Sequence, residues 1–264
     1  MLIKHLSLFT IYLLMYYLGW DVGIKNLSYC LLDSDKNIID WNIIDLTNKV
    51  DYYCEGEKKG GQVCGRGASY YYNNKCYCRV HSKKISACKE IYKCIECGKN
   101  SQFRDTKGIA FYCTKHNKPD TIQIINVKNV AKFPLQQIGN IMYEKLDAIP
   151  KLLEASVVVI ENQPVLKNPT MKSVQMLLYS YFLLKNKSVE LHFVSASSKL
   201  KFKINTESIK NIKSGKKTKY QKNKLLGIEY CEHFIGESEF FKSHKKRDDL
   251  ADSYLLTRYF IEKK

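Results

Sequence analysis

Eight of the ten cysteines lie between Cys54 and Cys113, within a quarter of the 264-residue chain. Two segments of this stretch, thirty-five residues apart, end in Cys-x2-His: Tyr77 to His81 and Tyr112 to His116. Cysteine and histidine at such spacings are typical of structural zinc sites, whereas a secreted disulfide framework would spread its cysteines over a short chain. We therefore expect zinc-bound thiolates and an intracellular, reducing compartment.

The spacing of these residues predicts two zinc sites. The more regular site follows C-x2-C-x15-C-x2-H, and its ligands are Cys94, Cys97, Cys113 and His116. For the less regular site we predict Cys54, Cys64, Cys78 and His81, with Cys76 or Cys88 as substitutes. Four protein ligands leave no position open for water, so we expect both zinc ions to be structural.

The cysteine-rich stretch differs in composition from the chain on either side. It contains seven glycines and shows no hydrophobic period of 2 or 3.6 residues. We predict an inserted zinc-binding module at 50–119, within a domain formed by residues 15–49 and 120–264. Residues 1–14 are expected to be an extension or a misassigned start, because Met15 offers a start directly before the first predicted strand. The uncharged run 6–20 is shorter than the roughly 20 residues that span a bilayer. No membrane partner is expected.

The remaining sequence alternates short apolar runs with segments of helical periodicity. Strands are predicted at 16–21, 27–33, 38–46, 157–161 and 189–194, and helices within 127–153 and at 169–187 and 244–260. Three antiparallel strands followed by alternating helices and strands predict an α/β protein. The expected architecture is an RNase H-like mixed sheet flanked by helices.

A strong positive charge points to a polyanionic partner. Lysine and arginine number 43 against 26 acidic residues, a formal net charge of +17. The segment Ser195 to Lys224 holds ten lysines and one acid, and we expect it not to fold alone but to contact nucleic acid flexibly. The predicted nucleic-acid contacts are Lys199, Lys201, Lys203, Lys216, Lys217, Lys219 and Lys222.

Four acidic residues stand where predicted strands end or a helix begins. Asp21 and Glu161 end strands, and Asp249 and Asp252 lie one turn apart on the last helix, with Asp248 as an alternative to Asp249. Carboxylates that converge at a sheet edge need cations, and oxygen ligands select Mg²⁺ or Mn²⁺. Two such ions would suit phosphodiester hydrolysis. Asn26 is a candidate for orienting water or phosphate.

The amino-acid sequence around these acids resembles that of the RuvC-like Holliday junction resolvases, in the branch found in poxviruses and other large DNA viruses. The resemblance covers residues 16–48 and about 125–262, through GWDVGIKNLSYCLLD, VVVIENQP with NPTMKSVQMLLYSYF, and DDLADSYLL. It implies that Asp21, Glu161, Asp249 and Asp252 hold two Mg²⁺ ions. It also implies a C2 homodimer, for which the predicted helix 169–187 is a candidate interface. Trp20 departs from the family, where a small aliphatic residue is usual.

The predicted function is therefore a magnesium-dependent endonuclease that cuts four-way junctions and other branched DNA. Its expected location is the host cytoplasm or, for a viral protein, the nucleus. One alternative is another RNase H-like nuclease, acting on RNA–DNA hybrids or transposon ends. A second is a zinc-stabilised nucleic-acid-binding or transcription protein without cleavage activity.

Overall fold

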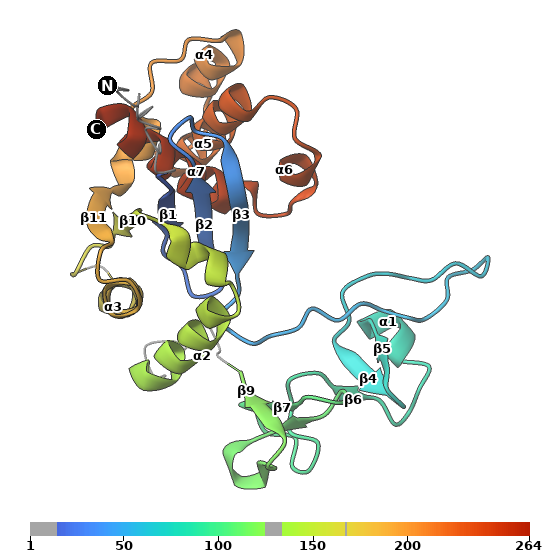
Figure 1. Ribbon diagram of the computed structural model, residues 1–264. Coiled ribbons are helices and arrows are strands. Elements are labelled where there is room, and N and C mark those ends of the chain that lie inside the picture. Colours follow the sequence, from blue (N-terminus) through green and yellow to red (C-terminus); the bar gives the residue numbers. More distant parts are fainter. Residues whose placement is uncertain (1–14, 125–133, 167) are drawn as a thin grey trace, which may run out of the picture. The chain divides into compact units, whose positions relative to one another are not determined.

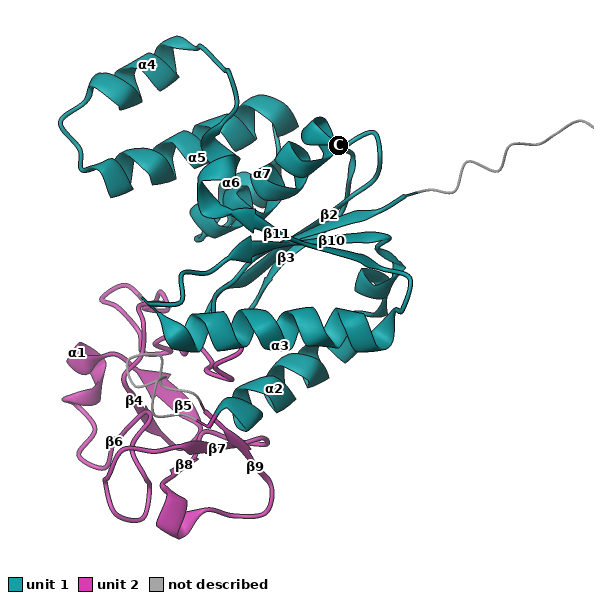
Figure 2. Cartoon of the chain, turned by 90° about the vertical axis from the view of Figure 1, so that its left-hand side faces the viewer, with its two compact units in different colours: residues 1–44, 135–264 teal, residues 45–134 magenta. Residues whose placement is uncertain are grey.

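The computed structural model describes residues 15–124, 134–166 and 168–264 (Figure 1). The chain divides into two compact units, which are residues 1–44 with 135–264 (unit 1) and residues 45–134 (unit 2) (Figure 2). Among the described residues, none of the helices has the length and apolar character needed to cross a membrane. The predicted extension at 1–14 lies outside the described residues.

A five-stranded mixed sheet forms the centre of unit 1, in the order β11-β10-β1-β2-β3. The first three strands, β1 (Tyr17–Asp21), β2 (Leu27–Leu32) and β3 (Ile38–Ile44), pair antiparallel as a meander. β10 (Val157–Asn162) runs parallel to β1, and β11 (Glu190–Ser195) runs parallel to β10. These directions and this order confirm the predicted RNase H-like mixed sheet.

Helices cover both faces of this sheet (Figure 2). α2 and α3 lie on one face, and α5, α6 and α7 lie on the other. Their bounds are α2 (Leu135–Asp147), α3 (Pro169–Lys185), α5 (Lys219–Ile235), α6 (Glu239–Ser243) and α7 (Arg247–Lys263). The predicted helical segment 127–153 is therefore α2 followed by a 3-10 turn, η3 (Pro150–Glu154), and its first residues lie outside the described part.

Burial on both faces accounts for the composition of the central strands. Val157 to Ile160 of β10 are fully buried, as is usual for parallel strands covered by helices on both sides. Gly19 of β1 lets α7 pack close, because a Cβ there would lie 1.8 Å from Oγ1 of Thr257. Trp20 fills the opposite side, with its ring centroid 5.2 Å from Tyr29 and 6.0 Å from Phe182 of α3.

The lysine-rich segment 195–224 folds, contrary to the prediction of a flexible loop. It forms η4 (Ala196–Leu200), α4 (Glu207–Ser214) and the first turn of α5. Apolar residues between the lysines explain the difference, because Ile209 is buried and Phe202, Ile204 and Ile212 pack against the same core. A capping box at Thr218 fixes the start of α5.

The predicted last helix, 244–260, corresponds to α7, which begins and ends three residues later, and the separate short helix α6 precedes it. His244, at the predicted start, has extended backbone angles and ends α6. α7 begins at Arg247, so Asp248 and Asp249 stand in its first turn. Acidic residues are favoured there by the helix dipole.

The described residues of unit 2 form two small three-stranded antiparallel sheets and two short helical turns. The first sheet has β4 (Tyr70–Tyr72), β5 (Lys75–Tyr77) and β6 (Lys89–Glu90), and α1 (Arg79–Ser82) follows β5. The second sheet has β7 (Phe103–Asp105), β8 (Phe111–Tyr112) and β9 (Thr121–Gln123), and η1 (Thr114–His116) follows β8. One small core joins them, with Tyr71, Cys76, Ile91, Phe111 and Ile124 buried together.

Candidate active site and zinc clusters

A pocket of about 630 Å³ at one edge of the unit 1 sheet is lined by all four predicted catalytic carboxylates. Asp21 and Glu161 stand at the ends of the neighbouring parallel strands β1 and β10, where Trp20 pairs with Ile160. Asp249 and Asp252 come from the first turns of α7, which packs against β1 and β2. Residues more than 200 positions apart in the sequence thus meet at one rim.

Lys199 lies among these carboxylates. Its Nζ is 2.5 Å from Oδ2 of Asp252, 2.9 Å from Oε2 of Glu161 and 3.7 Å from Oδ1 of Asp21, and only 12% of its side chain is exposed. Burial alone would lower the pKa of Lys199, but the three carboxylates raise it above its ordinary value. Lys199 is therefore a buried counter-charge of the pocket and does not lie on the open surface, and its contact with nucleic acid stays a prediction.

Burial shapes the protonation of three of the carboxyl groups. It raises the pKa of Asp252 to about 7, against the lowering effect of Lys199. Burial likewise raises the pKa of Asp21 well above its ordinary value and that of Asp249 above its own. Crowded carboxylates of this kind resist ionisation unless positive charge is placed among them. The donor set, four carboxylates and no thiolate, fits hard divalent cations such as Mg²⁺ or Mn²⁺.

The two neighbouring aspartates at the start of α7 have different partners. Asp249 accepts a hydrogen bond of 2.8 Å from Nδ2 of Asn26, which therefore positions this carboxylate. Asp248 forms an ion pair with Lys224. Burial would raise the pKa of Asp248, but the hydrogen bond and charge of Lys224 lower it. Both side chains line the pocket, and Asp249 also has Nζ of Lys246 at 3.8 Å from its Oδ2.

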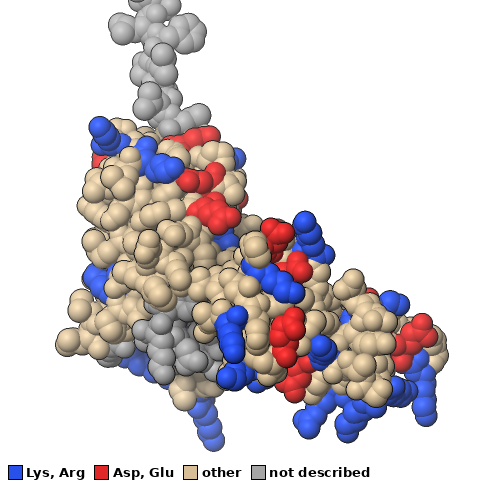
Figure 3. Space-filling model, turned by 90° about the horizontal axis from the view of Figure 1, so that it is seen from below, with Lys and Arg blue, Asp and Glu red and all other residues tan. Residues whose placement is uncertain are grey.

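The other predicted nucleic-acid contacts have separate positions. Lys201, Lys203, Lys216, Lys217 and Lys219 are exposed, and Lys219 lines the carboxylate pocket. Lys222 is held differently, since its Nζ donates a 2.7 Å hydrogen bond to the carbonyl oxygen of Lys213. On the face shown in Figure 3, lysine and arginine side chains are spread over several places, with acidic side chains among them.

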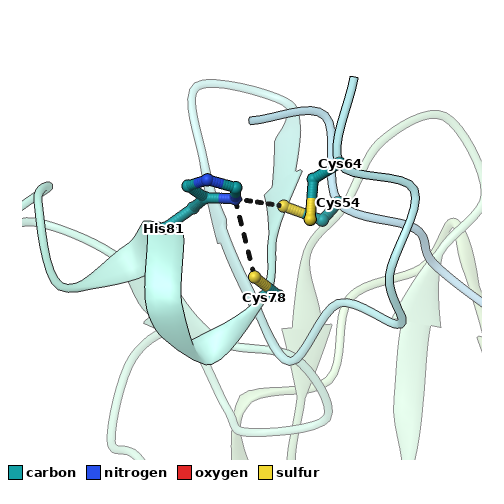
Figure 4. A group of neighbouring side chains, drawn as sticks. All are labelled: Cys54, Cys64, Cys78 and His81. Atoms are coloured by element: carbon teal, nitrogen blue, oxygen red, sulfur yellow. Dashed lines mark hydrogen bonds between the residues drawn. The ribbon is translucent and has the colours of Figure 1, made fainter. Parts of the chain in front are cut away.

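Both predicted sets of zinc ligands converge in unit 2. Within each set the ligand atoms lie within 4.8 Å of one another, and the sets are Cys54, Cys64, Cys78 and His81, and Cys94, Cys97, Cys113 and His116. Figure 4 shows the imidazole of the first set turned toward the sulfur atoms. Its Nδ1 lies 3.2 Å from Sγ of Cys54 and 3.6 Å from Sγ of Cys78. The substitutes Cys76 and Cys88 belong to neither cluster.

Thiolate formation is favoured at one cysteine of each cluster. Burial would raise the pKa of Cys78, but hydrogen bonds from the backbone of His81 and Val80 lower it to about 6. Backbone hydrogen bonds in the same way lower the pKa of Cys94 to about 6 against the effect of burial. Soft thiolates with an imidazole nitrogen are the donors of tetrahedral structural zinc sites.

The two clusters share one backbone design, beginning with the turn that carries the first two ligands. The N–H of Gly65 donates to the carbonyl of Cys54, and the N–H of Gly98 donates to the carbonyl of Cys94. Each glycine directly follows the second cysteine ligand, and their φ angles of 63° and 69° are left-handed, which favours glycine. The same turn thus occurs twice.

The rest of each module also matches. Cys78 and Cys113 precede α1 and η1 with nearly the same extended angles, so each Cys-x2-His lies on a helical turn after a hairpin. The third strand closes each sheet alike, since Ile91 N donates to Ser69 O and Ile124 N donates to Gln102 O. Unit 2 is therefore one module repeated in tandem, with nine residues between the first two ligands of one copy and two in the other.

Comparison with known proteins shows one clear relative. No family model matches the chain. An uncharacterized protein of Acanthamoeba polyphaga mimivirus, L451, is 32% identical over an alignment of 307 positions, gaps included, which covers 93% of this chain and 74% of L451. The chain belongs to the L451 family.

Solved structures similar to this L451-family protein include three resolvases. The yeast mitochondrial Holliday junction resolvase Ydc2 gives a TM-score of 0.43 at 14% identity, covering 93% of this chain and 78% of Ydc2. Thermus thermophilus RuvC in complex with Holliday junction substrate gives a TM-score of 0.41 at 8% identity, covering 94% of this chain and 96% of RuvC. A fowlpox virus resolvase in complex with Holliday junction DNA gives a TM-score of 0.37 at 12% identity, covering 94% of this chain and 98% of the resolvase. At these scores the likeness carries no weight for the activity of the L451-family protein.

Sequence reasoning missed two features of the site in this L451-family protein. The sequence predicts a nucleic-acid contact for Lys199 but no place among the carboxylates, although this lysine follows β11, whose end lies at the same sheet edge as those of β1 and β10. That position was an available signal. Tyr220 and Asn223 of α5 also line the pocket, and no sequence pattern marked them.

Proposed function

We propose that this protein is a divalent-metal-dependent endodeoxyribonuclease that cuts four-way junctions and other branched DNA. The observation that carries the proposal is the meeting of Asp21, Glu161, Asp249 and Asp252 in one pocket with a buried lysine. A formal charge of +17 and the exposed lysines of the α4–α5 segment favour a polyanionic substrate. Thiol ligands in unit 2 suit a reducing compartment, and a viral relative fits action inside a host cell.

The chemistry follows from the pocket residues. Asp21, Glu161, Asp249 and Asp252 would hold two divalent ions, which supply an activated water and stabilise the leaving 3′ oxygen. Asn26 fixes the orientation of the Asp249 carboxylate through its hydrogen bond. The ammonium of Lys199 lies in the same pocket beside Asp21, Glu161 and Asp252, and it would bind a phosphate oxygen of the substrate once metal ions take up these carboxylates. Hydrolysis would leave a 5′ phosphate and a 3′ hydroxyl.

Removal of one carboxylate tests this proposal. Asp21→Asn and Glu161→Gln should each reduce Mg²⁺-dependent cleavage of a synthetic four-way junction at least 100-fold, because metal binding needs the full negative charge. Binding to the junction should stay within about twofold, since the exposed lysines are untouched. The measurements are single-turnover cleavage and a gel-shift titration.

Asp35→Asn serves as the control, because Asp35 is an exposed acid outside the pocket. It should cleave as the wild type does. Equal losses of binding and cleavage in Asp21→Asn would contradict the assignment. Tight junction binding by the wild type with no Mg²⁺-dependent cleavage would favour the non-catalytic zinc-stabilised binder, and preferential cutting of RNA–DNA hybrids would favour the other nuclease class.

We also propose a C2 homodimer, because two opposed strands of a junction need two equivalent sites. α3 offers a face for it, since Met176, Leu183 and Leu184 are exposed by 40%, 49% and 77%. Leu184→Lys should shift the sedimentation coefficient from dimer to monomer at micromolar concentration. The exposed Leu135→Lys on α2 is the matched control, and a wild-type monomer would refute the dimer.

The two Cys/His clusters are proposed to hold one structural zinc ion each, in an inserted module. The support is the convergence of three sulfur atoms and one imidazole nitrogen in each cluster, with the same backbone turn at both. Closed sites of this composition contribute folding energy and no catalysis. The basic residues of unit 2 would then add to the contact with DNA.

A further inference from the structure

Tyr220, on the first turn of α5, is an exposed aromatic residue at the carboxylate pocket. Its exposed fraction is 68%, and it lines the same pocket as Asp21 and Asp249. Single exposed aromatic residues are common on protein surfaces. The position of this one is different, because its side chain lines the pocket that holds the four carboxylates.

Two neighbours on α5 connect Tyr220 to the site. Lys224, one turn later, has its Nζ 5.1 Å from the ring centroid and forms an ion pair with Asp248. The lysine therefore holds the ring beside the acidic cluster through a cation–π contact. Asn223, three residues after Tyr220, shares its helix face, is exposed and also lines the pocket.

This combination suits a nucleobase better than a phosphate group alone. An exposed ring beside lysines is the arrangement on which unpaired bases stack, while the lysines neutralise the backbone. An asparagine amide has both a donor and an acceptor for the edge of a base. Lys219, Lys224, the Tyr220 hydroxyl and the Asn223 amide could all bind a phosphate oxygen, but phosphate recognition would make no use of the exposed aromatic ring.

We propose that Tyr220 is a stacking platform for an unpaired nucleobase next to the phosphodiester that is cut, and that Asn223 contacts the edge of that base. This inference rests on the proposed nuclease function. The platform makes cleavage depend on a base that has left its stack, which happens at a branch point and not in continuous duplex. Selection of branched DNA would then occur at the pocket itself.

The test uses the full-length chain and a four-way junction with 2-aminopurine placed at successive positions around the branch. Without Mg²⁺, wild-type protein should quench or shift the fluorescence at one position through stacking, and Tyr220→Phe should do the same. Tyr220→Leu should lose the signal at that position and weaken junction binding about tenfold. Phe240→Leu is the matched control, since Phe240 is 44% exposed and outside the pocket lining.

Cleavage in Mg²⁺ separates this inference from the proposed function. If the wild type cuts no junction, the proposed nuclease function is refuted. The 2-aminopurine fluorescence still tests separately whether a base stacks on Tyr220. Equal signals for Tyr220→Leu and Phe240→Leu would overturn the stacking role. The same holds if Tyr220→Phe loses the signal, because the hydroxyl and not the ring would then be needed. Asn223→Ala should reduce binding less than Tyr220→Leu and leave the quenching in place.

Discussion

Lys199 is a single positive charge that faces three buried carboxylates, so its replacement would leave their negative charge uncompensated. Its ammonium contacts Asp252, Glu161 and Asp21 in a setting where burial favours neutral acids. In the absence of divalent ions it is the nearest positive charge to these groups among the described residues. Metal ions and this lysine therefore compete for the same oxygens, and binding of ions would leave the ammonium to the substrate.

Replacing this lysine should make stability depend on metal. In EDTA, Lys199→Met is expected to lower the free energy of unfolding by about 3 kcal/mol, because it leaves buried carboxylates without their partner. Mg²⁺ should recover most of that loss. Urea unfolding with and without Mg²⁺ measures both values, with Lys203→Met, at an exposed lysine, as control. A loss that Mg²⁺ leaves unchanged would show that the lysine acts only by packing.

At the scale of elements, the tandem modules of unit 2 show how little regular structure the fold needs there. Each sheet has strands of two or three residues, which cannot form a stable unit alone. The small shared core around Phe111 adds some burial. Metal binding is the remaining source of folding energy, so each cluster should control the structure of its own module.

Metal content distinguishes ligand cysteines from the others. Native mass spectrometry should find two zinc ions per wild-type chain and one in Cys97→Ser, because three ligands hold zinc much more weakly than four. Cys88→Ser is the matched control and should keep two, since Cys88 lies outside both clusters. One zinc ion in the wild type, or a loss of zinc in Cys88→Ser, would contradict the assigned ligands.

At the scale of the whole molecule, charge and apolar packing coexist in the same segments. The α4–α5 region carries most of the lysines of 195–224, yet Ile209 and Leu226 anchor it in the core. Its lysines are therefore held on a folded surface and do not move with a free loop. A fixed surface gives a fixed number of phosphate contacts, which salt titration can count.

Junction binding should weaken steeply with salt, because each phosphate contact releases counterions. Changing Lys216, Lys217 and Lys219 together to Gln should reduce the slope of log affinity against log salt by about three, one per contact. The control changes Lys151, Lys187 and Lys263, which are exposed lysines outside the α4–α5 segment. Equal slopes for the two triple variants would remove this surface from the DNA contact.

The sequence predicted features that depend on local pattern, and it failed where distant residues decide. The strand segments and both Cys/His sets follow from short-range periodicity and spacing, and the structure brings each set together. The folding of 195–224 depends on apolar residues reaching a core built by α5 and α7, which charge composition conceals. The burial of Lys199 depends on three carboxylates from three other elements.

The unequal spacing of the first two cysteines in the repeated modules has a practical consequence. Both modules close the same hydrogen bond after the second cysteine, although the connection is nine residues long in one and two in the other. The arrangement of these two ligands therefore does not depend on the number of residues between them. The tip at Lys58 to Gly61, where all four residues are exposed, is the natural place to graft a fluorophore or affinity tag for single-molecule work.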